Sequence, residues 1–294
     1  MFDKPMAFWL IQSLNSLSLG GLLFLLSAGF SGFSLIFGLM RIANLSHGAY
    51  FMLGAYIGLS ALRAGANFFV AMLLAGLAIA LLGGLIERLV IRRLSSNPLG
   101  QVLATLGIAF IIADGCLLYW TGDPQPLPTP EWLRGVFQVS SAAFPKYRIA
   151  VVGVAIVVAI FLWLLMDKTR IGAMIRAGVD DREMARGIGI PVSWLFTTVF
   201  CLGSFLAGMG GVLGGPILSV YPGLDTDMLP LALVVVILGG VGSLVGAFVG
   251  SFLIGLIYTF GQTLVPDLAY MILFLPMILV LALRPRGLFG RISA

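Results

Sequence analysis

Residues 41–48 read R-I-A-N-L-S-H-G and separate two strongly apolar stretches of the chain. They bring together an arginine, an asparagine, a serine and the single histidine of the sequence. Such a group forms either an ordinary turn at a membrane surface or a break in a helix inside the membrane, where it could contact a polar substrate. The lengths of the apolar stretches on either side help to decide between these two interpretations.

The composition places the chain in a bilayer. Of its 294 residues, 60% are hydrophobic and 10% are charged, and the mean hydropathy is +1.09. Soluble domains carry about 25% charged residues. We therefore predict an all-α fold, a polytopic transmembrane helical bundle, with residues 1–294 forming a single transmembrane domain. The first apolar run, from Leu17 to Met40, is longer than the apolar core of a cleavable signal peptide, about 7–15 residues, and is interpreted as a retained span.

Apolar stretches suited to membrane spans recur along the whole chain, and a span needs about 20 apolar residues. The candidates are 14–40, 48–62, 66–87, 99–120, 149–166, 192–214, 228–241, 243–263 and 267–283. These are nine spans, or eight if two short neighbours are fused.

Basic residues in the connections indicate the orientation. One side would carry twelve: Arg41, Arg88, Arg92, Arg93, Lys168, Arg170, Arg176, Arg182, Arg186, Arg284, Arg286 and Arg291. The other would carry five: Lys4, Arg63, Arg134, Lys146 and Arg148. The richer side is expected to be cytoplasmic. Nine spans then put the N-terminus outside and the C-terminus in the cytoplasm, and the net charge of +5 indicates membrane topology rather than nucleic-acid binding.

The two longest connections differ in kind. Residues 121–148 contain five prolines, which oppose a regular helix, and are predicted to form a periplasmic loop. Residues 167–191 are charged, have helical spacing, and reach Gly189 and Pro191, where a short helix would end. We predict that they form a cytoplasmic connection.

Two of the candidate spans are too short to cross. From Gly48 to Arg63 is about 22 Å of helix at 1.5 Å per residue, against about 30 Å of hydrocarbon. The stretch from Met228 to the glycine-rich break at 239–243 is similarly short. Short or interrupted segments in matching places of two halves point to a transporter binding site. We therefore predict broken helices near 41–48 and 239–246, facing the bundle interior as partners across a pathway.

The polar residues of these breaks are the candidate substrate pathway. Asn44 or Ser46 is predicted to cap the following helix, whose positive end favours an anion such as a carboxylate. His47 would donate to a substrate or fix the turn. Asp114 would either reach the outer interface near Trp120 or line the pathway. The full set is Asn44, Ser46, His47, Gly48, Asp114, Gly239, Gly240, Gly242 and Ser243.

Several functions are disfavoured by missing motifs. The sequence contains no phosphate-binding loop of the form G-x-x-x-x-G-K-[ST] and no H-E-x-x-H. One histidine cannot build a histidine-based zinc site or, without a G-x-S-x-G elbow, a serine hydrolase. The spans lack the chains of acids or histidines expected of a proton-driven carrier. We therefore expect no enzyme activity, cofactor, metal or ATP site in this chain, and an energy supply from another subunit.

Four stretches together resemble a known family. They are L-I-F-G-L-M-R-I-A-N-L-S-H-G-A-Y-F-M-L-G-A-Y, R-I-G-A-M-I-R-A-G-V-D-D-R-E-M-A-R-G-I-G-I at 170–190, V-V-V-I-L-G-G-V-G-S-L-V-G-A at 234–247, and L-R-P-R-G-L-F-G at 283–290. In this order they resemble bacterial branched-chain amino acid ABC transporter permeases of the LivH type. Relatives often have N-F-A-H-G-E at the first break, whereas this chain has N-L-S-H-G-A.

The resemblance implies an inner-membrane permease subunit that pairs with a second, related permease. Two cytoplasmic ATPase subunits would bind the ATP, and a periplasmic binding protein would deliver branched-chain or related hydrophobic amino acids. By position, the residues that dock on an ATPase would be Arg176, Ala177, Asp181, Ala185, Gly189 and Ile190. Urea, small amides and aromatic acids remain alternative substrates, and a self-contained carrier or channel remains the alternative from another class.

Overall fold

The computed structural model describes residues 6–40, 44–139 and 142–290, and for 30–40, 139, 142, 182 and 270 it describes the backbone alone. Within these ranges the chain is almost entirely helical, which confirms the predicted fold class. Arg41 and the next two residues of the opening stretch lie outside the described residues, as do Lys4 and Arg291.

Each of the nine predicted apolar stretches corresponds to one helix in the described part of the chain. These helices are α1 (Met6–Met40), α2 (His47–Arg63), α3 (Phe68–Ile86), α4 (Pro98–Trp120), α5 (Lys146–Lys168), α8 (Val192–Leu218), α9 (Leu224–Gly239), α10 (Leu244–Leu264) and α11 (Ala269–Leu283). Smaller elements are a π turn (Glu87–Ile91), the helices α6 (Arg170–Asp180) and α7 (Arg182–Gly187), and two 3-10 turns (Glu131–Leu133 and Pro266–Leu268).

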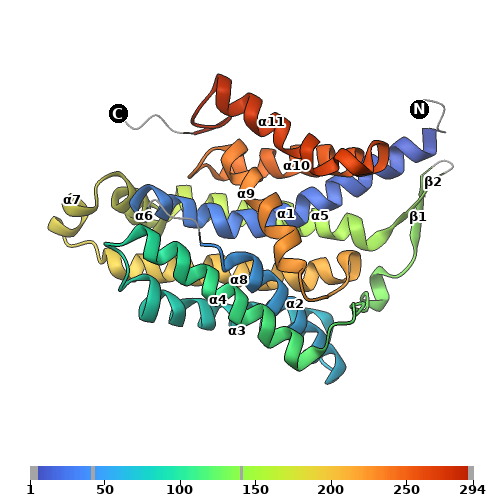
Figure 1. Ribbon diagram of the computed structural model, residues 1–294, viewed down its shortest axis with the longest axis horizontal. Coiled ribbons are helices and arrows are strands. Elements are labelled where there is room, and N and C mark those ends of the chain that lie inside the picture. Colours follow the sequence, from blue (N-terminus) through green and yellow to red (C-terminus); the bar gives the residue numbers. More distant parts are fainter. Residues whose placement is uncertain (1–5, 41–43, 140–141, 291–294) are drawn as a thin grey trace.

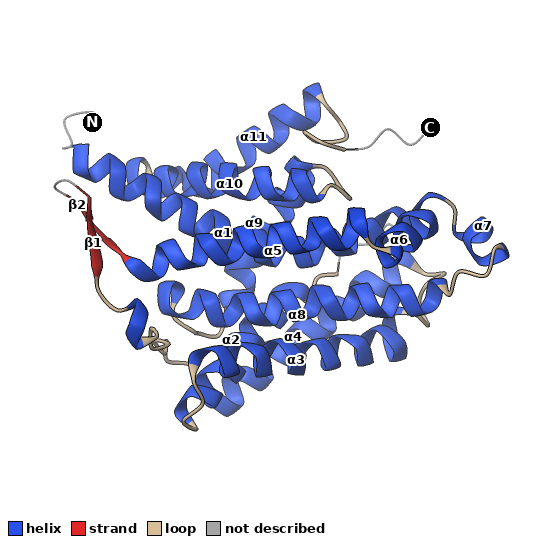
Figure 2. Ribbon diagram, turned by 180° about the vertical axis from the view of Figure 1, so that it is seen from behind, coloured by secondary structure: helices blue, strands red, loops and turns tan. Residues whose placement is uncertain are grey.

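The helices form layers around α1 and α8 (Figure 1). α10 and α11 lie on one side of α1, and α5 runs beside α1 (Figures 1 and 2). α2 and α3 cover the far side of α8, and α4 packs on α2. α9 connects the two sides, since it packs on both α2 and α10. The helices α6 and α7 lie at one end of the long axis, and the described N-terminus lies at the other (Figure 1).

Six helices among the described residues are long and apolar enough to cross a membrane. Three of the nine are shorter: α2 has 17 residues, α9 has 16 and α11 has 15. At 1.5 Å per residue, α2 and α9 are about 24–26 Å long, below the hydrocarbon thickness of about 30 Å. The prediction that these two helices are short is therefore confirmed.

The proline-rich connection contains a small sheet that the sequence analysis did not anticipate. Strands β1 (Val136–Val139) and β2 (Ala142–Pro145) pair antiparallel, with Phe137 opposite Phe144. The end of the predicted loop also differs, because α5 begins at Lys146. The hairpin leads directly into α5, so this connection is more ordered than its prolines suggested.

α2 and α8 approach each other closely through glycine. A Cβ atom built on Gly54 would lie 2.4 Å from the Cα of Gly208, so no larger side chain fits at this crossing. In lipid, where burial of apolar surface drives helix association weakly, such close backbone packing is a main source of affinity between helices. This crossing fixes α2 against α8, two turns after the break that precedes α2.

The replacement Gly54→Leu is expected to destabilise the protein by about 1–3 kcal/mol or more, because the added side chain must separate two backbones. Thermal unfolding of the detergent-purified protein measures the effect. Gly153→Leu is the matched control, since nothing lies within 4 Å of a Cβ at this exposed position of α5. Equal unfolding temperatures for the two variants would contradict the assigned crossing.

Candidate functional site

The first break lies inside the bundle rather than at its end. The backbone N–H of Leu45 donates to the Thr105 hydroxyl at 3.3 Å. Thr105 lies seven residues after Pro98, where α4 begins, so α4 extends about 10 Å beyond the break at 1.5 Å per residue. Figure 1 shows α2 beginning near the middle of the long axis, whereas α3, α4 and α8 continue toward the end occupied by α6 and α7.

The polar residues of this break bond mainly to one another and to α1. Asn44 Oδ1 accepts from the Ser46 N–H at 3.1 Å and from the Ser46 hydroxyl at 2.6 Å. His47 Nε2 lies 3.0 Å from the carbonyl oxygen of Leu26 in α1. All three side chains are buried. The break is thus a compact turn bonded to α1 and α4.

The predicted side-chain cap of α2 is wrong. Ser46 occupies the N-cap position, but its side chain makes no capping hydrogen bond. Asn44 Oδ1 is occupied by Ser46 itself, and its backbone carbonyl accepts from the His47 N–H at 3.2 Å. The reason is local: an Asn two residues before Ser46 closes a turn on that serine instead of reaching the helix.

The start of α2 packs directly against the start of α9. A Cβ atom on Gly48 would lie 2.8 Å from the carbonyl oxygen of Asp225. The Asp225 side chain is buried, and its Oδ1 has no hydrogen-bond partner among the described residues. Asn44 Nδ2 is equally unpartnered there. Buried polar atoms without partners require an explanation, and an ionisable group inside a membrane bundle is a functional candidate.

The sequence analysis missed Asp225. The available signal was an acid at the beginning of a helix too short to cross, next to the predicted pathway. Because Asp225 is 178 positions from His47, only the packing of α9 on α2 places this acid beside the first break.

The second break lies in different surroundings. α9 ends at Gly239, and the Ser243 hydroxyl caps α10 by accepting from the Gly246 N–H at 2.9 Å. The C-terminal segment closes over this turn: Leu288 and Phe289 donate their N–H groups to the carbonyls of Leu238 and Gly239 at 2.9 and 3.0 Å. Gly240 adopts a φ of +100°, which permits the backbone of this segment to approach.

The structure does not bring the two breaks together. Gly48 touches the first turn of α9, and Gly239 ends the same helix 14 residues after Asp225, which is about 21 Å along the axis. Gly242 and Ser243 instead line a pocket with Asp167 and Arg176, at the end near α6. The expectation that they face each other across one pathway therefore has no support from their neighbours.

Asp114 also lies apart from the first break. It is exposed on α4, six residues before Trp120, whereas the buried face of that helix carries Gln101, Thr105, Ala109 and Cys116. Its side chain points out of this subunit rather than into the buried interior.

The predicted coupling segment, residues 167–191, forms two helices instead of one. Asp181 separates α6 from α7 and caps α7, because its Oδ1 accepts from the N–H groups of Glu183 and Met184 at 2.9 Å each. Arg176 bonds the carbonyl of Met166 and lies 3.5 Å from Asp167, so it faces the end of α5. Arg176 and Asp181 therefore both stabilise the conformation of this segment.

The remaining predicted coupling residues divide by exposure. Ala185 is buried, Ala177 and Ile190 are partly buried, and Gly189 is exposed with a φ of +87°. An apolar cluster fixes the segment to the beginning of α8: it consists of Ile175, Ala185, Val192, Leu195, Phe196 and Val199. Because α6 also packs on α5 and α1, α8 is one of three membrane helices on which a movement of α6 and α7 would act.

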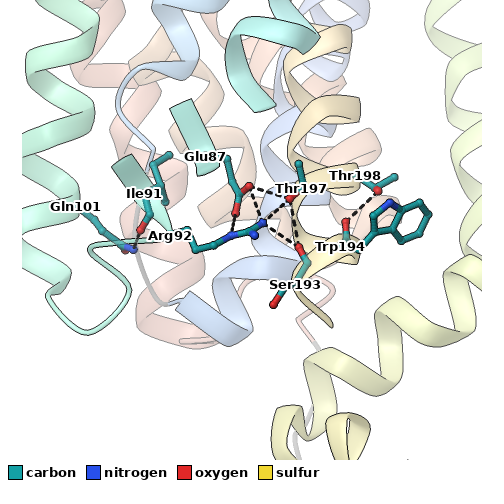
Figure 3. Close-up of polar contacts among 8 residues, drawn as sticks. All are labelled: Glu87, Ile91, Arg92, Gln101, Ser193, Trp194, Thr197 and Thr198. Carbon is teal, nitrogen blue, oxygen red and sulfur yellow. Dashed lines mark hydrogen bonds and ion pairs between the residues drawn. The ribbon is translucent and has the colours of Figure 1, made fainter. Parts of the chain in front are cut away.

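An ion pair between a buried carboxylate and a partly exposed arginine lies at the same end and was not predicted from the sequence (Figure 3). Glu87 accepts from Arg92 Nε at 3.0 Å and from Nη2 at 2.9 Å. The Thr197 hydroxyl on α8 donates to Glu87 at 2.8 Å, and Arg92 also bonds the Ser193 carbonyl at 3.0 Å. From the sequence, Arg92 was interpreted only as a cytoplasmic charge. The available signal was Glu87, the sole acid between Asp3 and Asp114, five residues before this arginine.

Comparisons with known proteins agree on one family. Residues 13–281 match the model described as branched-chain amino acid transport system / permease component. The chain is 27% identical to the high-affinity branched-chain amino acid transport system permease protein BraD of Pseudomonas aeruginosa, over 96% of both chains. It is 25% identical to the LivH permease protein of the same kind of system in Escherichia coli, over 98% of both.

A more distant relative is the autoinducer 2 import system permease protein LsrC of an Enterobacter species. It is 28% identical over 68% of this chain and 59% of that protein. No solved structure matches the chain.

Proposed function

Because this chain belongs to the family of branched-chain amino acid transport system permease components, we propose that it moves branched-chain or related hydrophobic amino acids across the inner membrane. It is a multi-pass transport subunit, and in this proposal it binds no ATP or other cofactor of its own. The observation that carries the proposal is the family match over residues 13–281, joined to a charged two-helix segment at one end of an apolar bundle.

The distribution of charge supports an orientation. In the described part of the chain, the end formed by α6 and α7 also carries the π turn, and the end with the β hairpin carries Arg134 and Lys146 (Figure 1). The described basic residues of α6, α7 and the π turn, which the sequence assigns to the cytoplasm, thus lie at one end. This supports a cytoplasmic C-terminus, a cytoplasmic segment 167–191 and a periplasmic connection 121–148.

The partners follow from this orientation. One of the two ATPase subunits would dock on the exposed side of α6 and α7, where Met184 and Ile188 are 64% and 68% exposed. A substrate-binding protein would approach the opposite end through residues 121–148 and 216–227. A second, related permease would cover part of the exposed apolar surface, and lipid would cover the rest.

The first break is the part of the chain proposed to open for substrate. It combines a helix start without a side-chain cap, the Asn44 Nδ2, which has no partner among the described residues, and the buried carboxylate of Asp225. A helix start favours a carboxylate, and a carboxylate favours an ammonium group, so together they suit the two charges of an amino acid. The second break and Asp114 remain weaker candidates for the pathway.

Reconstitution tests the proposal. Two samples would be reconstituted in liposomes: the chain alone, and the chain with its ATPase subunits and binding protein. Radiolabelled leucine, urea, an amide or an aromatic acid would be added outside. We expect ATP-dependent uptake of leucine by the complete system only. Flux through the isolated chain would instead support a self-contained channel or carrier, and preferential uptake of another solute would correct the substrate.

A further inference from the structure

We propose that the π turn at Glu87–Ile91 is the positioning element that transmits movement of the coupling segment to the first break. This inference rests on the proposed function, since it assumes that ATPase subunits move α6 and α7. Four sets of contacts connect the two regions: coupling segment to α8, α8 to the π turn, the π turn to α4, and α4 to the break.

The first contacts join the coupling segment to α8. Ile175 of α6 and Ala185 of α7 pack in one apolar cluster with Val192 and Phe196, in the first turns of α8. Ala185 is only 2% exposed, so a shift of α7 would disturb the packing that it shares with the start of α8.

The second contacts join α8 to the π turn and are polar. The Arg92 guanidinium spans the Glu87 carboxylate, the Thr197 hydroxyl and the Ser193 carbonyl (Figure 3). Glu87 is 5% exposed and accepts three hydrogen bonds from these partners. A buried carboxylate that loses its partners is strongly disfavoured, so this network keeps the π turn in its present form.

The third and fourth contacts run through α4. Gln101, buried in the first turn of α4, donates from Nε2 to the Ile91 carbonyl of the π turn at 2.7 Å. Thr105 follows one helical turn later, and its hydroxyl accepts from the N–H of Leu45 in the first break at 3.3 Å. A change in the π turn therefore reaches the break through one turn of one helix.

In this proposal the π turn switches between its present form and an α-helical one. In the present one, the Arg92 N–H donates to the Glu87 carbonyl at 2.8 Å, five residues back. If the turn closed as an α-helix, the same N–H would bond residue 88, and Arg92 would lie about 140° around the axis from Glu87. The ion pair would break. The contacts from α8 thus favour the π form, and displacement of α8 would release it.

The test uses the complete transporter with its ATPase subunits and binding protein in nanodiscs. Thr197→Val removes the hydroxyl between Arg92 and Glu87 at nearly constant volume. Thr198→Val is the matched control, because the Thr198 hydroxyl donates to the Trp194 carbonyl of its own helix at 3.0 Å and, within the described ranges, to no other helix. Thr105→Val removes the hydroxyl that accepts from the Leu45 N–H and so breaks the contact between α4 and the first break. This second variant provides the test if Thr197→Val does not assemble.

Two readouts separate transmission from general stability. We expect Thr197→Val and Thr105→Val to lower substrate molecules moved per ATP at least fivefold, with basal ATP hydrolysis and thermal stability near those of Thr198→Val. Hydrogen exchange of residues 44–48 should change on ATP binding in the control and stay constant in both variants. Normal stoichiometry and normal exchange changes in both would overturn the inference. Failure of the proposed function would appear earlier, as absent ATP-driven transport in the unmodified complex.

Discussion

The double replacement of Arg176 by glutamate and Asp181 by lysine is expected to abolish transport-coupled ATP hydrolysis. Asp181 caps α7, whose six residues have little helical stability of their own, so removal of this cap should unfold the helix. Glutamate at 176 would lie beside Asp167 and lose the bond to the Met166 carbonyl. We expect at least a tenfold loss, which corresponds to about 1.4 kcal/mol in the activation barrier.

Substrate-stimulated ATPase activity of the reconstituted complex measures this loss, and the cap and the charge of Asp181 can be separated. Asp181→Asn keeps a good cap and removes the charge, whereas Asp181→Ala removes both. Asp180→Asn, at the exposed last residue of α6, is the matched charge control. Full coupling in the doubly reversed protein would show that the ATPases act elsewhere. Full coupling in Asp181→Asn alone would assign the residue a role in shape rather than in docking.

The helices were predictable because the bilayer leaves the backbone few choices. In hydrocarbon, each N–H and C=O must bond within its own segment, so a long apolar run becomes a helix. The shortness of α2 followed from the distance between Gly48 and Arg63 in the sequence. Helix ends in polar sequence were harder: α1 begins at Met6, eight residues before the predicted start, in a stretch that contains Gln12 and Ser13.

The candidate site was predictable only where its members are adjacent in the chain. Asn44, Ser46 and His47 could be grouped from the sequence. The residues that contact this break, Leu26, Thr105 and Asp225, come from other helices, and a single sequence contains no information on such pairing. Glu87 and Arg92 were missed for a related reason. Five residues apart, they would point in different directions in an α-helix, and hydrophobic periodicity does not predict a π turn.

His47→Ala is expected to lower substrate uptake more than it lowers assembly of the transporter. The imidazole bonds the Leu26 carbonyl and packs on α1, where a Cβ on Gly29 would come within 3.0 Å of Nε2. Loss of the imidazole should change the free-energy difference between the two conformations in which the first break is accessible from one side of the membrane or from the other. A coupling of about 1–3 kcal/mol corresponds to a roughly 5- to 150-fold change in uptake. Uptake into vesicles, normalised to the assembled complex, measures this.

Two further variants identify the reason for the effect. Ser60→Ala removes the partner of the Trp120 indole N–H, a 2.8 Å bond that attaches the other end of α2 to α4. If any loosening of α2 impairs uptake, Ser60→Ala and His47→Ala should be equally poor, which would contradict a special role for the break. His47→Gln can still donate to the Leu26 carbonyl. Recovery of uptake in His47→Gln would mean that the histidine fixes the turn, whereas continued loss would mean that the imidazole itself meets the cargo.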